Sequence, residues 1–157
     1  MSLGLSGTTN DERTLSFYHT HTGKTLSVAY YKNGAYDTRA LAAIDDYLAD
    51  FRNGAEHHID PALLDVLYDI KLKTGTRAPF QVISAYRSPQ TNQMLRDRTV
   101  GVAKDSMHLR GQAIDVRLDD VPLERLRSVA LSLQKGGVGF YPESQFVHVD
   151  TGRVRRW

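Results

Sequence analysis

An aspartate in the middle of an apolar run is the feature that most limits how this chain can fold. The run is Ala113-Ile-Asp-Val-Arg-Leu118, and its composition is typical of a β-strand. Burying the Asp115 carboxylate without a partner costs several kcal/mol, because the charge loses its hydration. The fold must therefore bring a cation or hydrogen-bond donors to Asp115.

A histidine stands in a similar apolar run, at position 148 of the predicted strand 146–150. Side chains alternate along a strand, so His148 and Asp150 are expected on one face and the flanking valines on the other. His108, in the polar loop before Asp115, offers a second imidazole. Two imidazoles and one carboxylate are a common catalytic zinc set that leaves a fourth position for water. The residues alone leave open whether these three bind a metal or make structural hydrogen bonds.

The order of predicted elements is that of an α+β domain, because helices and strands do not alternate strictly. A β-hairpin is predicted first, from residues 14–21 and 24–31 around Thr22-Gly23. The other predicted strands cover 80–84, 113–118, 138–141 and 146–150, and the predicted helices cover 38–53, 61–74, 89–98 and 122–134. Residues 1–13 are expected to be a flexible tail or an expression scar, and residues 14–157 a single domain.

Some side chains within these elements carry expectations of their own. Thr38 is expected to cap the first helix and Asp60 the second. The apolar residues of the second helix, Leu72 among them, are expected to face the core. In the hairpin, His19 and His21 share a face and form a second candidate metal pair.

The composition excludes several classes of function. The chain contains no cysteine, which rules out a catalytic thiol, a disulfide framework and a cysteine-rich zinc knuckle. The formal net charge is only +2 and the basic residues are scattered until the end of the chain, so no nucleic-acid partner is expected. No stretch approaches the roughly 20 apolar residues of a membrane span, so no transmembrane segment is expected. The first residues lack the charged and apolar regions of a signal peptide.

Several sequence motifs resemble those of a known family. The segment Ser106-Met-His-Leu-Arg-Gly-Gln-Ala-Ile-Asp115 resembles the Ser-x-His-x-x-Gly-x-Ala-x-Asp motif of the D-alanyl-D-alanine metallopeptidase superfamily, which has the hedgehog/DD-peptidase fold. Ser84-Ala-Tyr-Arg-Ser88 is similar to its Ser-Gly-Tyr-Arg-Ser segment, and Phe146-Val-His-Val-Asp150 to its late strand. The closing stretch 136–157, with Thr91-Asn92 and residues 101–103, resembles the murein endopeptidase K branch.

This resemblance implies a fold and an activity. The implied fold is a central antiparallel sheet flanked by helices and preceded by the hairpin. The implied activity is that of a zinc-dependent peptidase that cuts peptide bonds in peptidoglycan stem peptides or cross-links, in the periplasm or cell envelope. Carried over by position, His108, Asp115 and His148 are the ligands of one Zn²⁺. Arg87 would hold a substrate carboxylate or the oxygen that becomes negative in the transition state.

One position departs from the pattern of the family. Many relatives carry a Glu or Asp general base shortly before the last His ligand, where this chain has Gln145. Asp150 is expected to act instead, either as the base or as a carboxylate that supports the ligands, and Glu143 is the other candidate base. Ser106, Tyr86, Gln145 and Glu143 are expected to contact the substrate or to support the ligands.

Two alternative functions accompany this prediction. The branch resemblance favours endopeptidase action over D,D- or L,D-carboxypeptidase action on the same substrate class. A catalytically inactive peptidoglycan-binding module of the same fold is the alternative from another class. The lack of a carboxylate at position 145 favours this inactive module.

Overall fold

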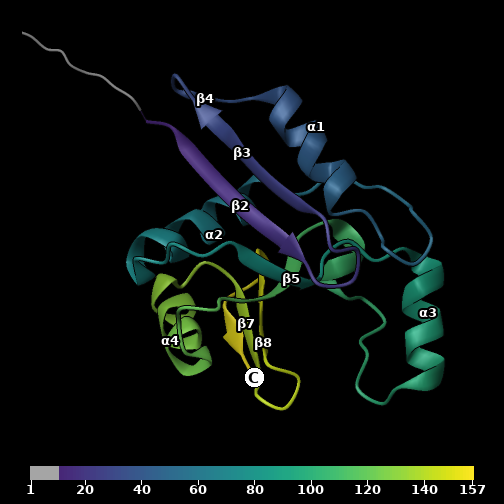
Figure 1. Cartoon of the computed structure of the whole chain (residues 1–157). Helices are drawn as coiled ribbons and strands as arrows, with labels where there is room; N and C mark the ends of the chain where they lie inside the picture. Colours follow the sequence, from purple (N-terminus) through teal and green to yellow (C-terminus); the bar gives the residue numbers. More distant parts are fainter. Residues whose placement is uncertain (1–10) are drawn as a thin grey trace, which may run out of the picture.

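A mixed sheet of eight strands runs through residues 11–157, the part of the chain that the computed structural model describes (Figure 1). The strands are β2 Arg13–His19, β3 Thr25–Lys32, β4 Ala35–Tyr36, β5 Phe80–Ser84, β6 Ala113–Arg117, β7 Gly137–Tyr141, β8 Phe146–Asp150 and β9 Arg155–Arg156. Their order across the sheet is β4-β3-β2-β5-β6-β8-β7-β9. The pairs β2–β5 and β7–β9 are parallel, and the other neighbours are antiparallel. The α+β class is confirmed, but the sheet is mixed rather than wholly antiparallel.

Four α-helices and a short 3₁₀ helix accompany the sheet in residues 11–157. They are α1 Thr38–Tyr47, α2 Pro61–Thr74, α3 Pro89–Arg98, η2 Met107–Arg110 and α4 Leu123–Leu133. Helix α2 contacts α4 and β2, α4 contacts β7 and β8, and α1 contacts β3. Helix α3 stands at the periphery, joined to the body by extended segments at both ends (Figure 1). No helix in the described residues is both long and apolar enough to cross a bilayer.

The predicted N-terminal hairpin is present as β2 and β3, and it is part of the sheet rather than an addition before it. Strand β2 pairs in parallel with β5, which joins the hairpin to the strands that follow. Residues 1–10 of the predicted tail lie outside the described residues, and Arg13 already belongs to β2.

Helix boundaries depart from the predictions at two places. The cap of α1 is Asp37 rather than Thr38, because the Asp37 side chain accepts hydrogen bonds from the main-chain N–H groups of the first turn. Helix α1 also ends at Tyr47, earlier than predicted, because Leu48 leaves the helical conformation with a ψ of 16°. The prediction for α2 is confirmed, with Asp60 as its cap. Leu72 is 61% exposed, because it lies about 200° around the helix from the buried Ile70.

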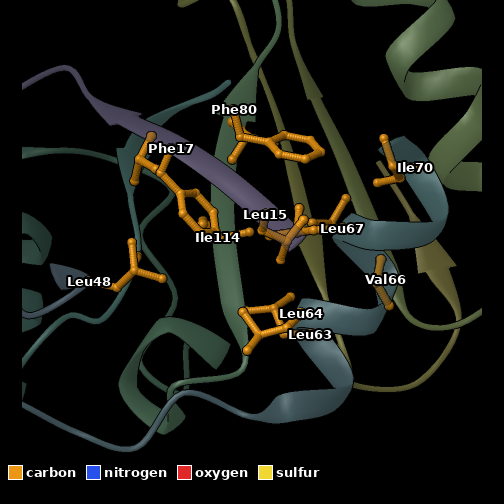
Figure 2. Packing of buried hydrophobic residues seen from close by; sticks show 14 of the residues in the cluster. Leu15, Phe17, Leu48, Leu63, Leu64, Val66, Leu67, Ile70, Phe80 and Ile114 are labelled. Carbon is orange, nitrogen blue, oxygen red and sulfur yellow. The ribbon is translucent and has the colours of Figure 1, made fainter. Parts of the chain in front are cut away.

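The hydrophobic core lies between α2 and the sheet. Figure 2 shows Leu63, Leu64 and Leu67 of α2 close to Leu15 of β2 and Ile114 of β6, and all five side chains are fully buried. Burial of a leucine-sized side chain stabilises the folded state by about 1.5–3 kcal/mol. The core therefore fixes which face of the sheet is turned away from α2.

The register of β6 and β8 assigns the polar residues of these strands to the opposite face. Ile114 lies opposite Val149, and both belong to the core. Asp115 lies opposite His148, and side chains that are adjacent along a strand project from opposite faces. Asp115 and His148 therefore lie on the face of the sheet opposite to Ile114, Val149 and the core.

His19, at the end of β2, is a packed core residue rather than part of a metal pair. It is 1% exposed, and its ring lies edge-on to the rings of Phe51 and Tyr47. Its Nδ1 accepts a hydrogen bond from the main-chain N–H of His21 at 3.2 Å. The ring of His21 stacks on Phe51 with centroids 4.1 Å apart. Burial, with a smaller contribution from His21, lowers the pKa of His19 to about 4.

This low pKa predicts a specific loss of stability in mild acid. Between the unfolded pKa of about 6.5 and the folded value, the unfolded chain binds the extra proton, so stability falls as the pH falls. The loss approaches about 1.4 kcal/mol per pH unit within this window. We expect the difference in unfolding free energy between the wild type and His19→Phe to shrink from pH 7 to pH 5 in urea titrations. If this difference in unfolding free energy does not change with pH, the lowered pKa of His19 is contradicted.

Candidate metal centre and groove

Two imidazoles and a carboxylate from three elements converge on the face of the sheet opposite to Ile114 and Val149. They are His108 of η2, Asp115 of β6 and His148 of β8, all buried. One ligand atom from each lies within 4.8 Å of the others, and no other such cluster occurs in residues 11–157. His108 Nε2 is 3.3 Å from one Asp115 oxygen, and His148 Nδ1 is 2.9 Å from the other. The structure thus brings together the three predicted ligands.

Local structure explains how each ligand reaches the cluster. The β6–β8 register brings Asp115 and His148 together. Ser106 caps η2 by accepting a hydrogen bond from the N–H of His108 at 3.2 Å. Gly111 ends η2 with a positive φ of 66°, where a Cβ would lie 2.1 Å from the carbonyl oxygen of His58. Only glycine allows the chain to turn directly from His108 into β6.

The outer nitrogens of both histidines are already held by acceptors. The Nδ1–H of His108 donates to the carbonyl oxygen of Ala85 at 2.7 Å, which leaves Nε2 for a ligand bond. The Nε2–H of His148 donates to Asp150 at 2.7 Å, which leaves Nδ1 toward Asp115. Metal-binding histidines usually show this pattern, because an acceptor on the outer nitrogen fixes the tautomer and the ring orientation.

The spacing of the donor atoms fits a small divalent cation. Tetrahedral ligands at about 2.0–2.2 Å from a metal lie roughly 3.3 Å from each other. One ligand atom of each of the three residues lies within 4.8 Å of the others, so a small shift of the side chains brings them to this spacing. The residues present therefore fit a metal ion held by two imidazoles and one carboxylate.

The electrostatics of the cluster also favour a positive charge at its centre. Burial acts to raise the pKa of Asp115, but His108 and His148 hold it well below its usual range. Burial acts to lower the pKa of His148, but Asp115 and Asp150 outweigh it and raise the pKa to about 9. These carboxylates favour a positive charge beside His148, and a metal ion would supply one.

Asp150 is enclosed by donors and does not face the groove. Its side chain is fully buried and accepts hydrogen bonds from His148, from the guanidinium of Arg155 and from the N–H groups of Gly137 and Gly152. Burial acts to raise the pKa of Asp150, but these donors hold it well below its usual range. Of the two roles considered for Asp150, the geometry favours support of His148 over proton transfer from water.

Arg87 brings a cation close to the cluster. Its main-chain N–H donates to the carbonyl oxygen of His108 at 3.1 Å, and its guanidinium donates to Asn92 at 3.0 Å. Its Nε is buried and has no hydrogen-bond partner among the described residues. Burial lowers the pKa of Arg87, and the charge of Asp115 acts in the opposite direction. The guanidinium thus keeps donor capacity for an anionic group.

A groove of about 390 Å³ opens beside the cluster. Residues of the segment 99–108 contribute to its lining, and so do the predicted residues Arg87 and Ser106. Its aromatic lining residues are Tyr141, Phe146 and Trp157. The substrate of a metal-dependent reaction would lie in this groove, because the three candidate ligands also line it.

Three predicted site residues, Tyr86, Glu143 and Gln145, do not line this groove. Tyr86 is 8% exposed and stacks on the ring of His57, with centroids 5.1 Å apart. Glu143 and Gln145 lie exposed in the turn between β7 and β8. Gln145 has a positive φ of 60°, and its side chain donates to the carbonyl oxygen of Pro142 within the same turn. The turn directs both side chains into solvent, so position 145 does not reach the metal cluster.

Several residues that contribute to the site were not predicted, Asp105 of the groove lining among them. Tyr141 and Trp157 line the groove, and Arg155 both lines it and binds Asp150. The only sequence signal was the resemblance of the segment 136–157 to the murein endopeptidase K branch. Trp157 is 50% exposed.

The corner that carries Arg87 is held by a buried carboxylate. Asp50 is 0% exposed and accepts hydrogen bonds from the main-chain N–H groups of Ser88 and Arg52, both at 2.9 Å. Burial acts to raise the pKa of Asp50, but hydrogen bonds from Thr91, Ser88 and Arg52 lower it. Asp50 therefore fixes the segment that enters α3 directly after Arg87.

Comparisons of the sequence with a family model and with known proteins point to the same family. The family model described as peptidoglycan L,D-endopeptidase MepK matches residues 7–157. The chain is 43% identical over 145 residues to the peptidoglycan L,D-endopeptidase MepK of Escherichia coli (strain K12), covering 92% of this chain and 80% of that protein. It is also 43% identical over 146 residues to the probable peptidoglycan L,D-endopeptidase MepK of Haemophilus influenzae, covering 92% and 78%. No solved structure matches the chain.

Replacing the carboxylate of Asp50 by an amide is expected to destabilise the fold. In Asp50→Asn an amide NH₂ would face one of the two main-chain N–H donors, which leaves a buried donor without a partner. We expect a loss of about 2 kcal/mol in urea unfolding. The matched control is Asp46→Asn in an exposed position of α1, with an expected change within about 0.5 kcal/mol. Equal stability of the two variants would contradict the role of Asp50.

Proposed function

The chain belongs to the metallopeptidase family described as peptidoglycan L,D-endopeptidase MepK, and from this premise we propose that it is a zinc-dependent enzyme that hydrolyses peptide bonds in peptidoglycan. The observation that carries the proposal is the buried cluster of His108, Asp115 and His148 at the side of a groove. The relatives are named L,D-endopeptidases, so cleavage within the peptide is favoured over carboxypeptidase trimming. Because peptidoglycan lies in the cell envelope, we place the reaction in the periplasm or envelope.

Zinc is the metal that suits these ligands best. Imidazole and carboxylate donors in a three-residue set are typical of catalytic zinc sites with one open position. A bound zinc ion would supply Lewis acidity that makes water nucleophilic near neutral pH and polarises a carbonyl. His108 and His148 are held in the required tautomers by Ala85 and Asp150 before any metal binds.

Arg87 is proposed to bind the negative charge of the substrate. The charge is either a substrate carboxylate or the oxygen that becomes negative in the transition state, and a guanidinium suits both. Its buried Nε, which has no partner within residues 11–157, and its place in the groove lining support this role. Ser106, which lines the groove and caps η2, is proposed to hold the His108 segment in place.

The two carboxylates near the cluster are proposed to have different roles. Asp150 is a positioning residue, because its oxygens are occupied by donors and it holds the Nε2–H of His148. Asp105 is the only carboxylate other than Asp115 among the described residues that line the groove, and it is exposed. We therefore assign the acceptance of a proton from water to Asp105.

The alternative of an inactive binding module loses its main support. That alternative depended on Gln145, which stands where many relatives carry a base. Gln145 lies in an exposed turn outside the groove lining, so the residue at this position does not decide whether the groove is catalytic.

Digestion of purified sacculi tests the proposed activity directly. We expect mass spectrometry to detect cleaved muropeptides with the zinc-loaded protein, none after chelation, and recovery when zinc is restored. His108→Ala should release no product, because a ligand is missing.

Zinc at about 100 times its dissociation constant should stabilise the folded wild type against unfolding by about 2.7 kcal/mol. Retention on sacculi with zinc bound but no bond cut would instead favour the inactive module.

Two substitutions separate the proposed roles of the carboxylates. Asp150→Asn should weaken zinc binding roughly 10- to 100-fold, because it removes the charge that supports His148. Asp105→Asn should leave zinc affinity unchanged and lower kcat by at least about 100-fold. Competition with a fluorescent chelator and kinetics at saturating zinc measure the two effects. Unchanged zinc affinity in Asp150→Asn together with a large loss of kcat would make Asp150 the base after all.

A further inference from the structure

The aromatic side of the groove takes no part in the hydrolysis described above, although it lies next to the metal cluster. Trp157 is 50% exposed and Tyr141 is 37% exposed, and both line the groove. The indole of Trp157 lies with its ring centroid 5.1 Å from that of His148. Tryptophan and tyrosine are the side chains that most often dominate recognition surfaces, because they offer a large rigid apolar area.

The strand register explains why the indole lies beside the metal ligands. Residues directly opposite each other in an antiparallel pair project from the same face. Asp115 lies opposite His148, and His148 lies opposite Gly139 of β7. Gly139 has no side chain, and a Cβ there would lie 2.5 Å from Cε2 of Trp157. The row across β6, β8 and β7 is therefore carboxylate, imidazole and indole.

Arg87 lies on the other side of this row. It follows β5, which neighbours β6 on the side away from β8. The metal cluster thus lies between a guanidinium and an indole in the order of the strands. A peptide that crosses the cluster along this row would meet a cationic group at one end and an apolar surface at the other.

The indole is fixed before any substrate binds. Its Nε1–H donates to the hydroxyl of Tyr141 at 2.8 Å, and the Tyr141 ring stacks on Phe146 with centroids 4.5 Å apart. The main chain of Trp157 pairs with Val138 and Phe140 of β7 at 3.1 Å and 3.0 Å. Its polar group is satisfied, so the exposed face is left for apolar contact. A surface fixed in this way costs little conformational entropy on binding.

We propose that Trp157 determines specificity by binding the aliphatic part of the stem-peptide residue next to the bond that is cut, on the side away from Arg87. This inference rests on the proposed function. An extended peptide advances about 3.3–3.6 Å per residue, so the 5.1 Å between the rings of His148 and Trp157 spans one or two peptide residues.

Kinetics on cross-linked muropeptides test the assignment. Trp157→Ala is expected to raise KM roughly tenfold, the size of a lost aromatic contact, while kcat and zinc affinity stay within about twofold. A merely structural role would instead lower zinc affinity or the yield of folded protein. The matched control is Tyr18→Ala, which removes another exposed aromatic ring, on β2 and outside the groove lining, and should leave KM unchanged.

Two further measurements keep the inference testable if Trp157→Ala does not fold. Gly139→Ala keeps the tryptophan but places a Cβ where the indole lies, so it should displace the ring and reproduce the rise in KM. Trp157 is also the only tryptophan in the sequence, so intrinsic fluorescence reports on this position alone. Titration of the His108→Ala variant with the same muropeptides should change this fluorescence saturably without any cleavage.

The outcomes separate this inference from the proposed function. If the wild type cleaves muropeptides and both the Trp157 and Gly139 variants keep the wild-type KM, the specificity role is wrong and the hydrolase proposal stands. If the wild type cleaves nothing, the hydrolase proposal fails. In that case a saturable fluorescence change still supports contact between the stem peptide and the indole. Fluorescence that stays constant throughout the titration overturns this contact.

Discussion

Asp115 and His148 face each other across the β6–β8 pair, and the candidate site depends on this register. The same pairing places Ile114 opposite Val149 in the core. A slip of one residue would turn the apolar side chains toward the groove and the charged ones into the core. The hydrophobic core therefore fixes the register, and the register in turn fixes the distance between two metal ligands.

A buried carboxylate links the metal cluster to the end of the chain. Asp150 holds the Nε2–H of His148 on one side and the guanidinium of Arg155 on the other. Arg155 lies in β9, which pairs in parallel with β7 and leads directly to Trp157. Metal binding and the aromatic side of the groove thus share one structural support. Removing Arg155 would be costly, because the buried charge of Asp150 would lose part of its compensation.

The groove is assembled from segments that are far apart in the sequence. Arg87 is held at the end of β5 by contacts of its neighbour Ser88 with Asp50 and by its own bond to Asn92. Asn92 also donates to the carbonyl oxygen of Ala103, which ties α3 to the segment that lines the groove. The sheet supplies two of the three candidate ligands and η2 supplies the third, and these hydrogen bonds position the groups expected to meet the substrate. Rigid strands suit the first task, because ligand geometry tolerates little movement.

Local rules account for what the sequence by itself determined. The alternation of side chains predicted the strands and the common face of His148 and Asp150, and the cost of burying a carboxylate marked Asp115 as a residue that needs a partner. Capping residues predicted α2 correctly, whereas α1 is capped by Asp37, the residue before the predicted cap. These are properties of neighbouring residues, so they can be predicted from the sequence.

The tertiary structure alone decided where the side chains of Gln145, Asp150 and Trp157 lie. Counting residues back from His148 suggested a catalytic position at Gln145, but a turn directs that side chain into solvent. Alternation brought Asp150 to the face of His148, but only Arg155 and the glycine N–H groups show that its oxygens are occupied. Trp157 enters the groove because β9 pairs with β7 and Gly139 leaves room for the indole. Pairing between distant segments and the space left by a missing side chain exist only once the chain has folded, so no local pattern could show them.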